Sequence, residues 1–298
     1  MFSPALNRDE KAAVARLFSS HVIRELATVG RSRLFARLVH NTGLFTGPQL
    51  KGRVRDAFEA AFAVLRSVDH RNEYIYRTAL THRILLGTHN LNTACMLTEF
   101  RVGDCKADAA ILNGTGTVYE IKSERDTLSR LEKQLDAYQR VFARVFVIAG
   151  ENHVDAIVRS TPKEIGVLCL SKGKHISTVR EADERPDRIC PVTVFESIRT
   201  DEAKLIVKKF GLAVPDVPNT VMRTELRKMF TILKPVEIHD AMVRTLKATR
   251  NLLPLAELIA NVPPSLTSAA LSIPLRKSDQ KQLVHSLDTK LIEAINWV

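Results

Sequence analysis

The sequence predicts an α/β fold: a mixed sheet flanked by helices, with further helical segments at the N-terminal and C-terminal ends. Three observations support this fold class. Apolar and β-branched runs flank an Asn-Gly turn between residues 106 and 122, which is the pattern of a β-hairpin. The later runs 144–149 and 165–170 are continuously apolar, as in strands that are covered on both faces. Segments of helical periodicity separate these runs.

The order of the expected elements divides the chain into three segments. Residues 1–70 are predicted to form an N-terminal helical module, and residues 196–298 a C-terminal helical domain. Residues 71–195 are predicted to form the α/β core, in the order helix, three strands, helix, strand, helix, strand. At 298 residues the chain is long enough for two domains, or for one core with large additions.

Each element has a local justification in periodicity and in its end signals. The expected elements of the core are 73–86 (helix), 96–102, 106–112 and 117–122 (strands), 126–142 (helix), 144–149 (strand), 153–160 (helix) and 165–170 (strand). The expected helices of the two ends are 9–29, a second segment that opens with 31–37 and is broken by Gly43 and by Gly47-Pro48, then 51–68, 201–210, 224–233, 236–250, 255–259 and 280–297.

The charge balance is basic, with a formal net charge of +11. Residues 1–70 carry 11 basic and 6 acidic residues (+5), residues 71–195 carry 18 and 16 (+2), and residues 196–298 carry 15 and 11 (+4). The excess therefore lies mostly in the two helical ends, and it fits a polyanionic partner such as DNA. A solvated basic surface without a partner is the alternative interpretation.

Two groups of basic residues are candidates for contact with phosphate. Arg31, Arg33 and Arg37 open the second helical segment, and a solvated helix face is an equally good interpretation of them. In the C-terminal domain a helix pair is a candidate for docking on a DNA backbone, although nothing identifies a recognition helix. Its basic residues are Lys204, Lys208, Lys209, Arg223, Arg227 and Lys228.

Several classes of protein are disfavoured. No run approaches the roughly 20 apolar residues of a membrane span, and the N-terminal residues lack the pattern of a signal peptide. Cys95, Cys105, Cys169 and Cys190 are scattered, without a C-x-x-C pair, so we expect reduced thiols rather than a zinc site or disulfides. The expected location is cytoplasmic, with no membrane partner.

Charged residues stand out within the hairpin. Glu120 and Lys122 share one face of their strand, and a turn centred near Gly114 places Asp108 roughly opposite Glu120. Buried charge is costly unless it is paired, so packing alone does not explain these residues. Two carboxylate ligands suit a hard divalent cation such as Mg²⁺.

The hairpin and its surroundings resemble the PD-(D/E)XK nuclease superfamily, nearest to an uncharacterised bacterial branch with helical flanks. The resemblance covers about residues 72–170. The residues that carry it are Thr98-Glu-Phe-Arg-Val-Gly103, Lys106-Ala-Asp108, Tyr119-Glu-Ile-Lys-Ser-Glu-Arg-Asp126, Arg130-Leu131 and Gln134-x-x-x-Tyr138. One departure is Ala107, where the superfamily pattern has proline.

The resemblance implies a restriction-endonuclease-like core and a set of site residues. Asp108 and Glu120 would hold Mg²⁺, for which Mn²⁺ can substitute, together with the backbone carbonyl of Ile121. Lys122 would orient the attacking water or stabilise developing charge. Two further acids are implied as metal ligands, Glu73 on the helix before the sheet and, more weakly, Glu99 on the first strand.

The following helix is implied to contact substrate. Gln134 and Tyr138 lie four residues apart and so share a helical face with Arg130. Asp108, Glu120 and Lys122 are called the trio below. Ser123, which follows Lys122 directly, is a further candidate for phosphate contact. Two of these residues have a structural alternative, which is a core position for Tyr138 and an ion pair with Asp126 for Arg130.

The other acids have structural alternatives too. Instead of binding a metal, the trio would form a structural ion-pair network. Glu73 would then be an acid in the first turn of a helix, and Glu99 a strand residue in a salt bridge.

The sequence therefore predicts a Mg²⁺-dependent nuclease that hydrolyses phosphodiester bonds in DNA, as an endonuclease. The alternative is a catalytically silent nucleic-acid-binding or regulatory protein on the same fold, in a phage, mobile-element or defence context. A third hypothesis is an interaction module whose helical flanks bind a protein partner or a second copy of the chain.

Overall fold

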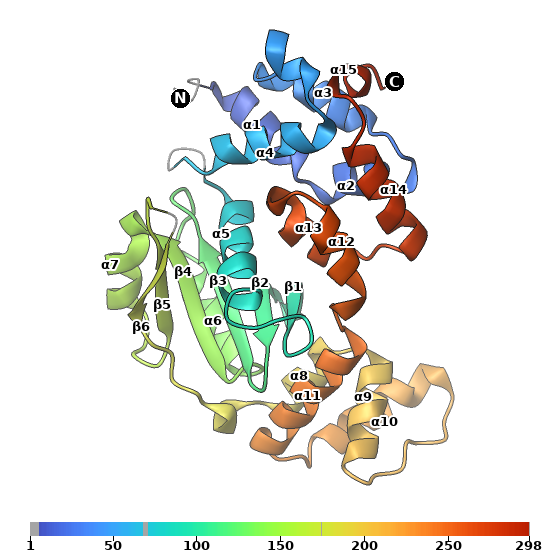
Figure 1. Cartoon of the computed structure of the whole chain (residues 1–298). Coiled ribbons are helices and arrows are strands. Elements are labelled where there is room, and N and C mark those ends of the chain that lie inside the picture. The colour runs from blue at the N-terminus through green and yellow to red at the C-terminus, as the bar shows by residue number, and fades with distance from the viewer. Residues whose placement is uncertain (1–5, 68–70, 174, 298) are drawn as a thin grey trace. The chain divides into compact units, whose positions relative to one another are not determined.

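A six-stranded mixed sheet contains the hairpin predicted from the sequence (Figure 1). The structure is a computed structural model that describes residues 6–67, 71–173 and 175–297. The strands lie side by side in chain order. They are β1 (Cys95–Val102), β2 (Cys105–Leu112), β3 (Gly116–Lys122), β4 (Arg144–Gly150), β5 (Gly166–Leu170) and β6 (Ile176–Arg180).

The pairing of neighbouring strands changes twice across the sheet, from antiparallel to parallel and back. β1, β2 and β3 are antiparallel neighbours, β3, β4 and β5 run parallel, and β6 is antiparallel to β5. The two parallel crossovers contain α6 (Leu131–Gln139), which packs on β2 and β4, and α7 (Glu151–Ser160), which packs on β4 and β5. The α/β class, the mixed sheet and the helical ends are therefore confirmed.

β6 was not predicted. Of its five residues, Ser177, Thr178 and Val179 are exposed and the two end residues are only partly covered, so the strand has no apolar run. It forms an edge of the sheet and pairs only with β5 in the described part of the chain. An edge strand open to solvent lacks the hydrophobic pattern by which the other strands were recognised.

The chain separates into two compact units. The first consists of Met1–Thr81 and Leu253–Val298, and the second of His82–Leu252. This division differs from the three consecutive segments expected from the sequence, because the last helices pack with the N-terminal ones and the middle helices pack with the sheet.

The first unit is helical. Its α-helices are α1 (Arg8–Leu17), α2 (Ser20–Thr28), α3 (Arg33–Thr42), α4 (Val54–Leu65), α5 (Glu73–Leu80), α12 (Ala256–Asn261), α13 (Thr267–Ser272), α14 (Lys277–Leu287) and α15 (Leu291–Ala294). Aromatic side chains fill part of its core: the Phe18 ring lies 5.6 Å from that of Phe58 and 4.7 Å from that of Tyr74.

The second unit contains the sheet with α6 and α7, and four more α-helices among its described residues. They are α8 (Pro191–Ser197), α9 (Thr200–Lys209), α10 (Asn219–Phe230) and α11 (Pro235–Thr249). The shorter helical turns of both units are η1 (Gly47–Lys51), η3 (Thr81–Leu85), η4 (Pro186–Arg188), η5 (Leu253–Leu255) and η6 (Pro264–Leu266). The pair of buried Glu202 and partly buried Arg250, 2.7 Å apart, links α9 to the end of α11.

Several predicted helices have different limits in the structure. The helix expected over 9–29 is two helices, because Ser19 leaves the helical conformation and caps α2 through Val22 N. The helix expected over 280–297 is likewise divided at Lys290, the N-cap of α15. In both cases apolar periodicity continues across a break in the backbone, so periodicity alone could not reveal the break.

The helix expected over 126–142 begins only at Leu131, and that expected over 73–86 continues as the π-turn η3 after Leu80. Among the described residues, no helix combines the length and the apolar character that crossing a membrane requires.

Candidate active site

The hairpin of β2 and β3 has the register expected from its turn. Leu112 pairs with Gly116 and Ala109 with Tyr119, and the next position on each strand is Asp108 and Glu120. Gly114 in the turn has φ +132°, a conformation that glycine adopts without steric cost. Asp108 is therefore opposite Glu120, at the end of the hairpin away from the turn.

Asp108 is fixed by the backbone of the neighbouring strand. Its Oδ2 accepts a hydrogen bond from the Ile121 amide at 2.7 Å. Its side chain is half-buried, in contrast to the fully covered β3. Asp108 therefore has both a fixed position and access to solvent.

Glu120 is the centre of a buried polar network. Its side chain is only 2% exposed. One carboxylate oxygen, Oε1, accepts from Lys122 Nζ at 2.8 Å and from Gln134 Nε2 at 2.5 Å. The other, Oε2, accepts from the Tyr138 hydroxyl at 2.8 Å. A buried carboxylate needs such partners, since its desolvation would otherwise be costly.

Lys122 and Gln134 also contact each other. Lys122 Nζ donates to Gln134 Oε1 at 3.0 Å, so the Gln134 amide accepts from the ammonium while it donates to Glu120. Gln134 lies on α6, which the 131–139 sequence forms with Leu131, Leu135 and Tyr138 facing inward. The helix therefore places one side chain between the two charged groups of β3.

Tyr138 completes the contacts from α6. Its hydroxyl lies 2.8 Å from Glu120 Oε2 and 3.0 Å from the carbonyl oxygen of Lys106. Burial and the Glu120 carboxylate raise the pKa of the Tyr138 hydroxyl far above its ordinary value, so it stays protonated and donates. The ring is fully buried, as in the alternative of a core position. The predicted contact of Tyr138 with substrate stays a prediction.

The donor chemistry fits Mg²⁺. Asp108 and Glu120 supply carboxylates, Ile121 a backbone carbonyl, and Mg²⁺ commonly uses one or two carboxylates together with water and substrate phosphate oxygens. A carboxylate offers about four acceptor sites, and Glu120 uses three of them on protein donors. Within the described residues no three His, Cys, Asp or Glu side chains gather as a metal site. Water and substrate would therefore have to complete the coordination.

Two predicted substrate contacts are not joined to this network. The Ser123 hydroxyl and amide both donate to Asp126 Oδ2, at 2.6 and 2.7 Å, in a turn after β3. That turn, which a Ser-x-x-Asp pattern signals, delays the start of α6 to Leu131. Arg130 is the N-cap residue of α6 and is exposed. Its predicted role in binding substrate stays a prediction.

The two additional acids have other surroundings. Glu73 belongs to the first unit, where its carboxylate pairs with Arg77 at 3.0 Å on α5. Glu99 is exposed and pairs with Lys106 at 3.1 Å, which matches the alternative of a salt-bridged strand residue. Glu99 also has φ +53°, the one positive value outside glycine among the described residues.

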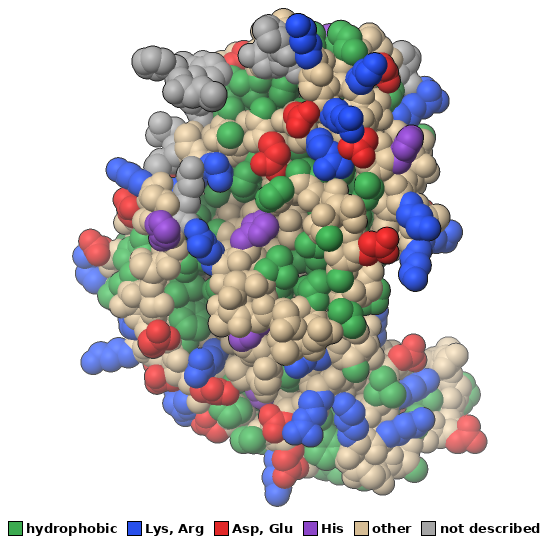
Figure 2. Space-filling view, viewed as in Figure 1, with side chains coloured by type: hydrophobic (Ala, Val, Ile, Leu, Met, Phe, Trp, Pro, Cys, Tyr) green, Lys and Arg blue, Asp and Glu red, His purple; other side chains and the backbone are tan. Residues whose placement is uncertain are grey.

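The basic residues of the C-terminal helices are largely engaged. Arg223 stacks over the Phe195 ring, with the guanidinium carbon 4.5 Å from the ring centroid, and donates to the Phe195 carbonyl. Arg227 pairs with Glu196, Lys228 with Glu225, and Lys209 donates to Thr245. Figure 2 shows Lys and Arg side chains over the α9–α11 part of the visible face. Many of these charges therefore support the helix packing.

Comparisons with known proteins connect the chain to a phage protein. Protein cII of Enterobacteria phage P4 is 28% identical over 102 residues, which cover 34% of this chain and 38% of the phage protein. A solved structure, the SPO1766 protein of unknown function from Silicibacter pomeroyi, is 19% identical over 47% of this chain and 93% of its own, with a TM-score of 0.31.

A family model described as "Bacteriophage P4 protein cII" matches residues 66–252. The match includes all six strands, the trio and α6, and it ends where the second unit ends. It spans more than half of the 298 residues. The chain therefore belongs to the Bacteriophage P4 protein cII family.

Proposed function

We propose that the chain is a Mg²⁺-dependent nuclease that hydrolyses phosphodiester bonds in DNA, as an endonuclease. One observation carries the proposal: Lys122 and Glu120 form a buried pair that Gln134 holds from α6, and Asp108 lies across the hairpin. A carboxylate pair beside a lysine supplies metal ligands and a cation for negative charge at one place.

The side chains have separate roles in this proposal. Asp108 and Glu120, with the Ile121 carbonyl, hold the cation, and Mg²⁺ bound there lowers the pKa of a water and offsets charge on the phosphate. Lys122 orients that water or stabilises the charge that develops on phosphate. Gln134 and Tyr138 fix the position of the Glu120 carboxylate from α6. The basic charge of the chain attracts the DNA.

Two observations favour a second function, a nucleic-acid-binding or regulatory protein of a phage that does not hydrolyse its ligand. Three protein donors already occupy the Glu120 carboxylate, as in a structural network. The family is named after a phage protein, and this supports the phage context of the second function better than it supports hydrolysis.

A cleavage panel separates the two functions. Purified protein is incubated with supercoiled plasmid, linear duplex, single-stranded DNA and RNA, each with Mg²⁺, Mn²⁺ or EDTA. The nuclease proposal expects metal-dependent cleavage that Asp108→Ala and Lys122→Ala abolish. Lys133→Ala, which removes an exposed lysine of α6, is the matched control and should cleave normally.

Undiminished cleavage by both site variants would show that another site acts. Absence of cleavage on every substrate, with retained binding of DNA, would establish the second function instead.

A further inference from the structure

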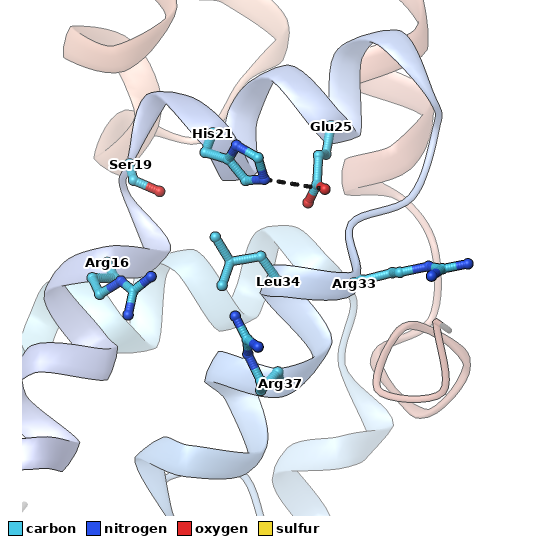
Figure 3. A pocket seen from close by; sticks show the side chains of 7 residues that line it. All are labelled: Arg16, Ser19, His21, Glu25, Arg33, Leu34 and Arg37. Carbon is cyan, nitrogen blue, oxygen red and sulfur yellow. Dashed lines mark ion pairs between the residues drawn. The ribbon is translucent and has the colours of Figure 1, made fainter.

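A basic hollow lies in the first unit, and none of its lining residues belongs to the proposed nuclease site. It has a volume of about 650 Å³ and is lined by seven residues of α1, α2, α3 and the turn between the first two helices. Arg16, Arg33 and Arg37 are three of them, and Glu25 is the only acidic one. Figure 3 shows the hollow with these side chains.

The arginines differ in their direction. Figure 3 shows Arg16 and Arg37 extending into the hollow from α1 and α3, on either side of Leu34. Arg33 extends away from it. The two inward guanidiniums come from helices that pack against each other, so the fold holds them on one surface.

The two inward arginines lack a carboxylate partner in the part of the chain that the structure describes. Among the described residues, Arg16 and Arg37 take part in no ion pair, whereas Arg53 and Arg55 of the same unit pair with Asp288. The carboxylate of Glu25 contacts other groups, with Oε1 3.2 Å from Nε2 of His21, which also lines the hollow, and Oε2 accepting from the Ser32 hydroxyl at 2.6 Å. The hollow therefore keeps an excess of positive charge.

We infer that this hollow binds phosphate groups of a nucleic-acid backbone through Arg16 and Arg37. Guanidinium groups form paired, charge-assisted hydrogen bonds with phosphate oxygens. No Phe, Tyr or Trp lines the hollow, and its one imidazole, that of His21, is paired with Glu25, so the lining favours phosphate contact over base stacking. Contacts of this kind position a nucleic acid without reading its sequence. The inference does not depend on hydrolysis at the Asp108 site.

The lining also favours a chain of phosphates over a free nucleotide. A nucleotide pocket usually encloses the base and surrounds it with apolar side chains, and Leu34 is the one apolar residue here. Residues 1–70 carry a net charge of +5, so adjoining phosphates of a polymer would also be attracted.

The test measures binding by the full-length protein in EDTA, where metal-dependent cleavage cannot contribute. Fluorescence anisotropy of a labelled duplex gives Kd between about 50 and 200 mM salt. The variants are Arg16→Gln, Arg37→Gln and the double variant. Arg24→Gln, which removes an exposed arginine of α2 outside the hollow, is the matched control. Circular dichroism and thermal melting verify that each variant is folded.

The double variant should show a several-fold higher Kd, and the slope of log K against log salt should fall by about 1.8, which is two phosphate contacts on duplex DNA. Arg24→Gln and Arg33→Gln should change the slope far less. Because binding is measured in EDTA, failure of the nuclease proposal leaves this result intact.

Three outcomes would overturn the inference. The double variant could match Arg24→Gln in both Kd and slope. Millimolar inorganic phosphate could raise the melting temperature of wild type but not of the double variant while both proteins bind DNA with the same Kd, which would assign the hollow to free phosphate. In a parallel titration with labelled poly-glutamate, the double variant could lose poly-glutamate binding while its DNA binding stays unchanged. This result would assign the hollow to an acidic polypeptide.

Discussion

Lys122 Nζ lies 2.8 Å from Glu120 Oε1 on the same strand, and the two side chains are only 9% and 2% exposed. The residues are two positions apart on β3, so their side chains leave the same face of the sheet. The pair is enclosed by α6 through Gln134 and Tyr138. Its charges are thus satisfied within the protein before any ligand binds.

Removal of the ammonium should destabilise the fold. Lys122→Met keeps most of the side-chain volume but leaves the buried Glu120 carboxylate short of its counter-charge, and breaking a buried ion pair costs about 3–5 kcal/mol. The free energy of unfolding, from urea titration, should fall by about this amount. The double variant Lys122→Met with Glu120→Gln should recover part of the loss, because no buried charge is then left unpaired.

Lys133→Met is the control for that experiment. Lys133 is 71% exposed and lies 3.9 Å from Asp104, so its loss should change stability by no more than about 0.5 kcal/mol. Equal stability of the Lys122 and Lys133 variants would mean that the pair is not formed as described.

Gln134 should affect both stability and hydrolysis. Gln134→Ala removes a donor to Glu120 and an acceptor for Lys122, and an unsatisfied buried partner costs about 1–3 kcal/mol. Cleavage of DNA should fall because Lys122 loses its orientation, while the Kd for DNA in EDTA should change little. Asp136→Ala, an exposed position on the same helix, should leave both properties near wild type. A change in Kd without a change in cleavage would instead make Gln134 a binding residue.

Tyr138 should make the protein sensitive to alkaline pH. Its hydroxyl ionises at about pH 10 in the unfolded chain, whereas burial beside Glu120 raises its pKa in the fold. The unfolded state therefore releases the proton first, and stability is complete below about pH 10 and falls as the pH rises further. Burial also raises the pKa of Tyr74 and Tyr119, so three tyrosines contribute to this loss.

The measurement is the urea midpoint of wild type and Tyr138→Phe on both sides of about pH 10. At neutral pH the variant should be less stable by about 1.5–3 kcal/mol, the contribution of a hydrogen bond to a charged group. Its stability should decline less above pH 10, because one of the three tyrosines is gone. Parallel curves for the two proteins would contradict the contact with Glu120.

Most of the sheet could be predicted from the sequence because its strands are buried. β4 is covered along Val145–Gly150, and the β2–β3 hairpin has a turn sequence that specifies its register. β6 escaped prediction because exposed Ser177 and Thr178 provide no apolar pattern. The break at Ser19 escaped because side-chain periodicity does not report the backbone conformation that ends a helix.

Part of the candidate site was predictable because its residues also follow local sequence patterns. Asp108, Glu120 and Lys122 are charges on a strand pair, which a local pattern reveals, and Gln134 and Tyr138 follow at one helical spacing. Arg16 was missed because its neighbour in the hollow, Arg37, is on another helix, and only packing of α1 on α3 brings the two together. The late start of α6 was missed for another reason: the Ser-x-x-Asp pattern of the Ser123–Asp126 turn is local, but the apolar periodicity continues across it.

His239 should impose a dependence on mildly acidic pH. Its Nε2 accepts a hydrogen bond from the Gly116 amide at 3.1 Å, which links α11 to the first residue of β3 and requires an unprotonated nitrogen. Burial lowers the pKa of His239 below its ordinary value of 6.5. The unfolded state therefore gains the proton first as the pH falls. The stabilisation is complete above about pH 6.5 and declines below it, by up to about 1.4 kcal/mol per pH unit.

Unfolding by urea at about pH 7.5 and pH 5 tests this, since most carboxylates remain ionised in that range. His239→Gln retains an acceptor for Gly116 but cannot titrate, so its stability should change less between the two pH values than that of wild type. His21→Gln alters an exposed histidine of α2 and should follow the wild-type pH profile. If His239→Gln also follows the wild-type profile, the buried imidazole is not the titrating group, and the link between Gly116 and α11 has no effect on acid stability.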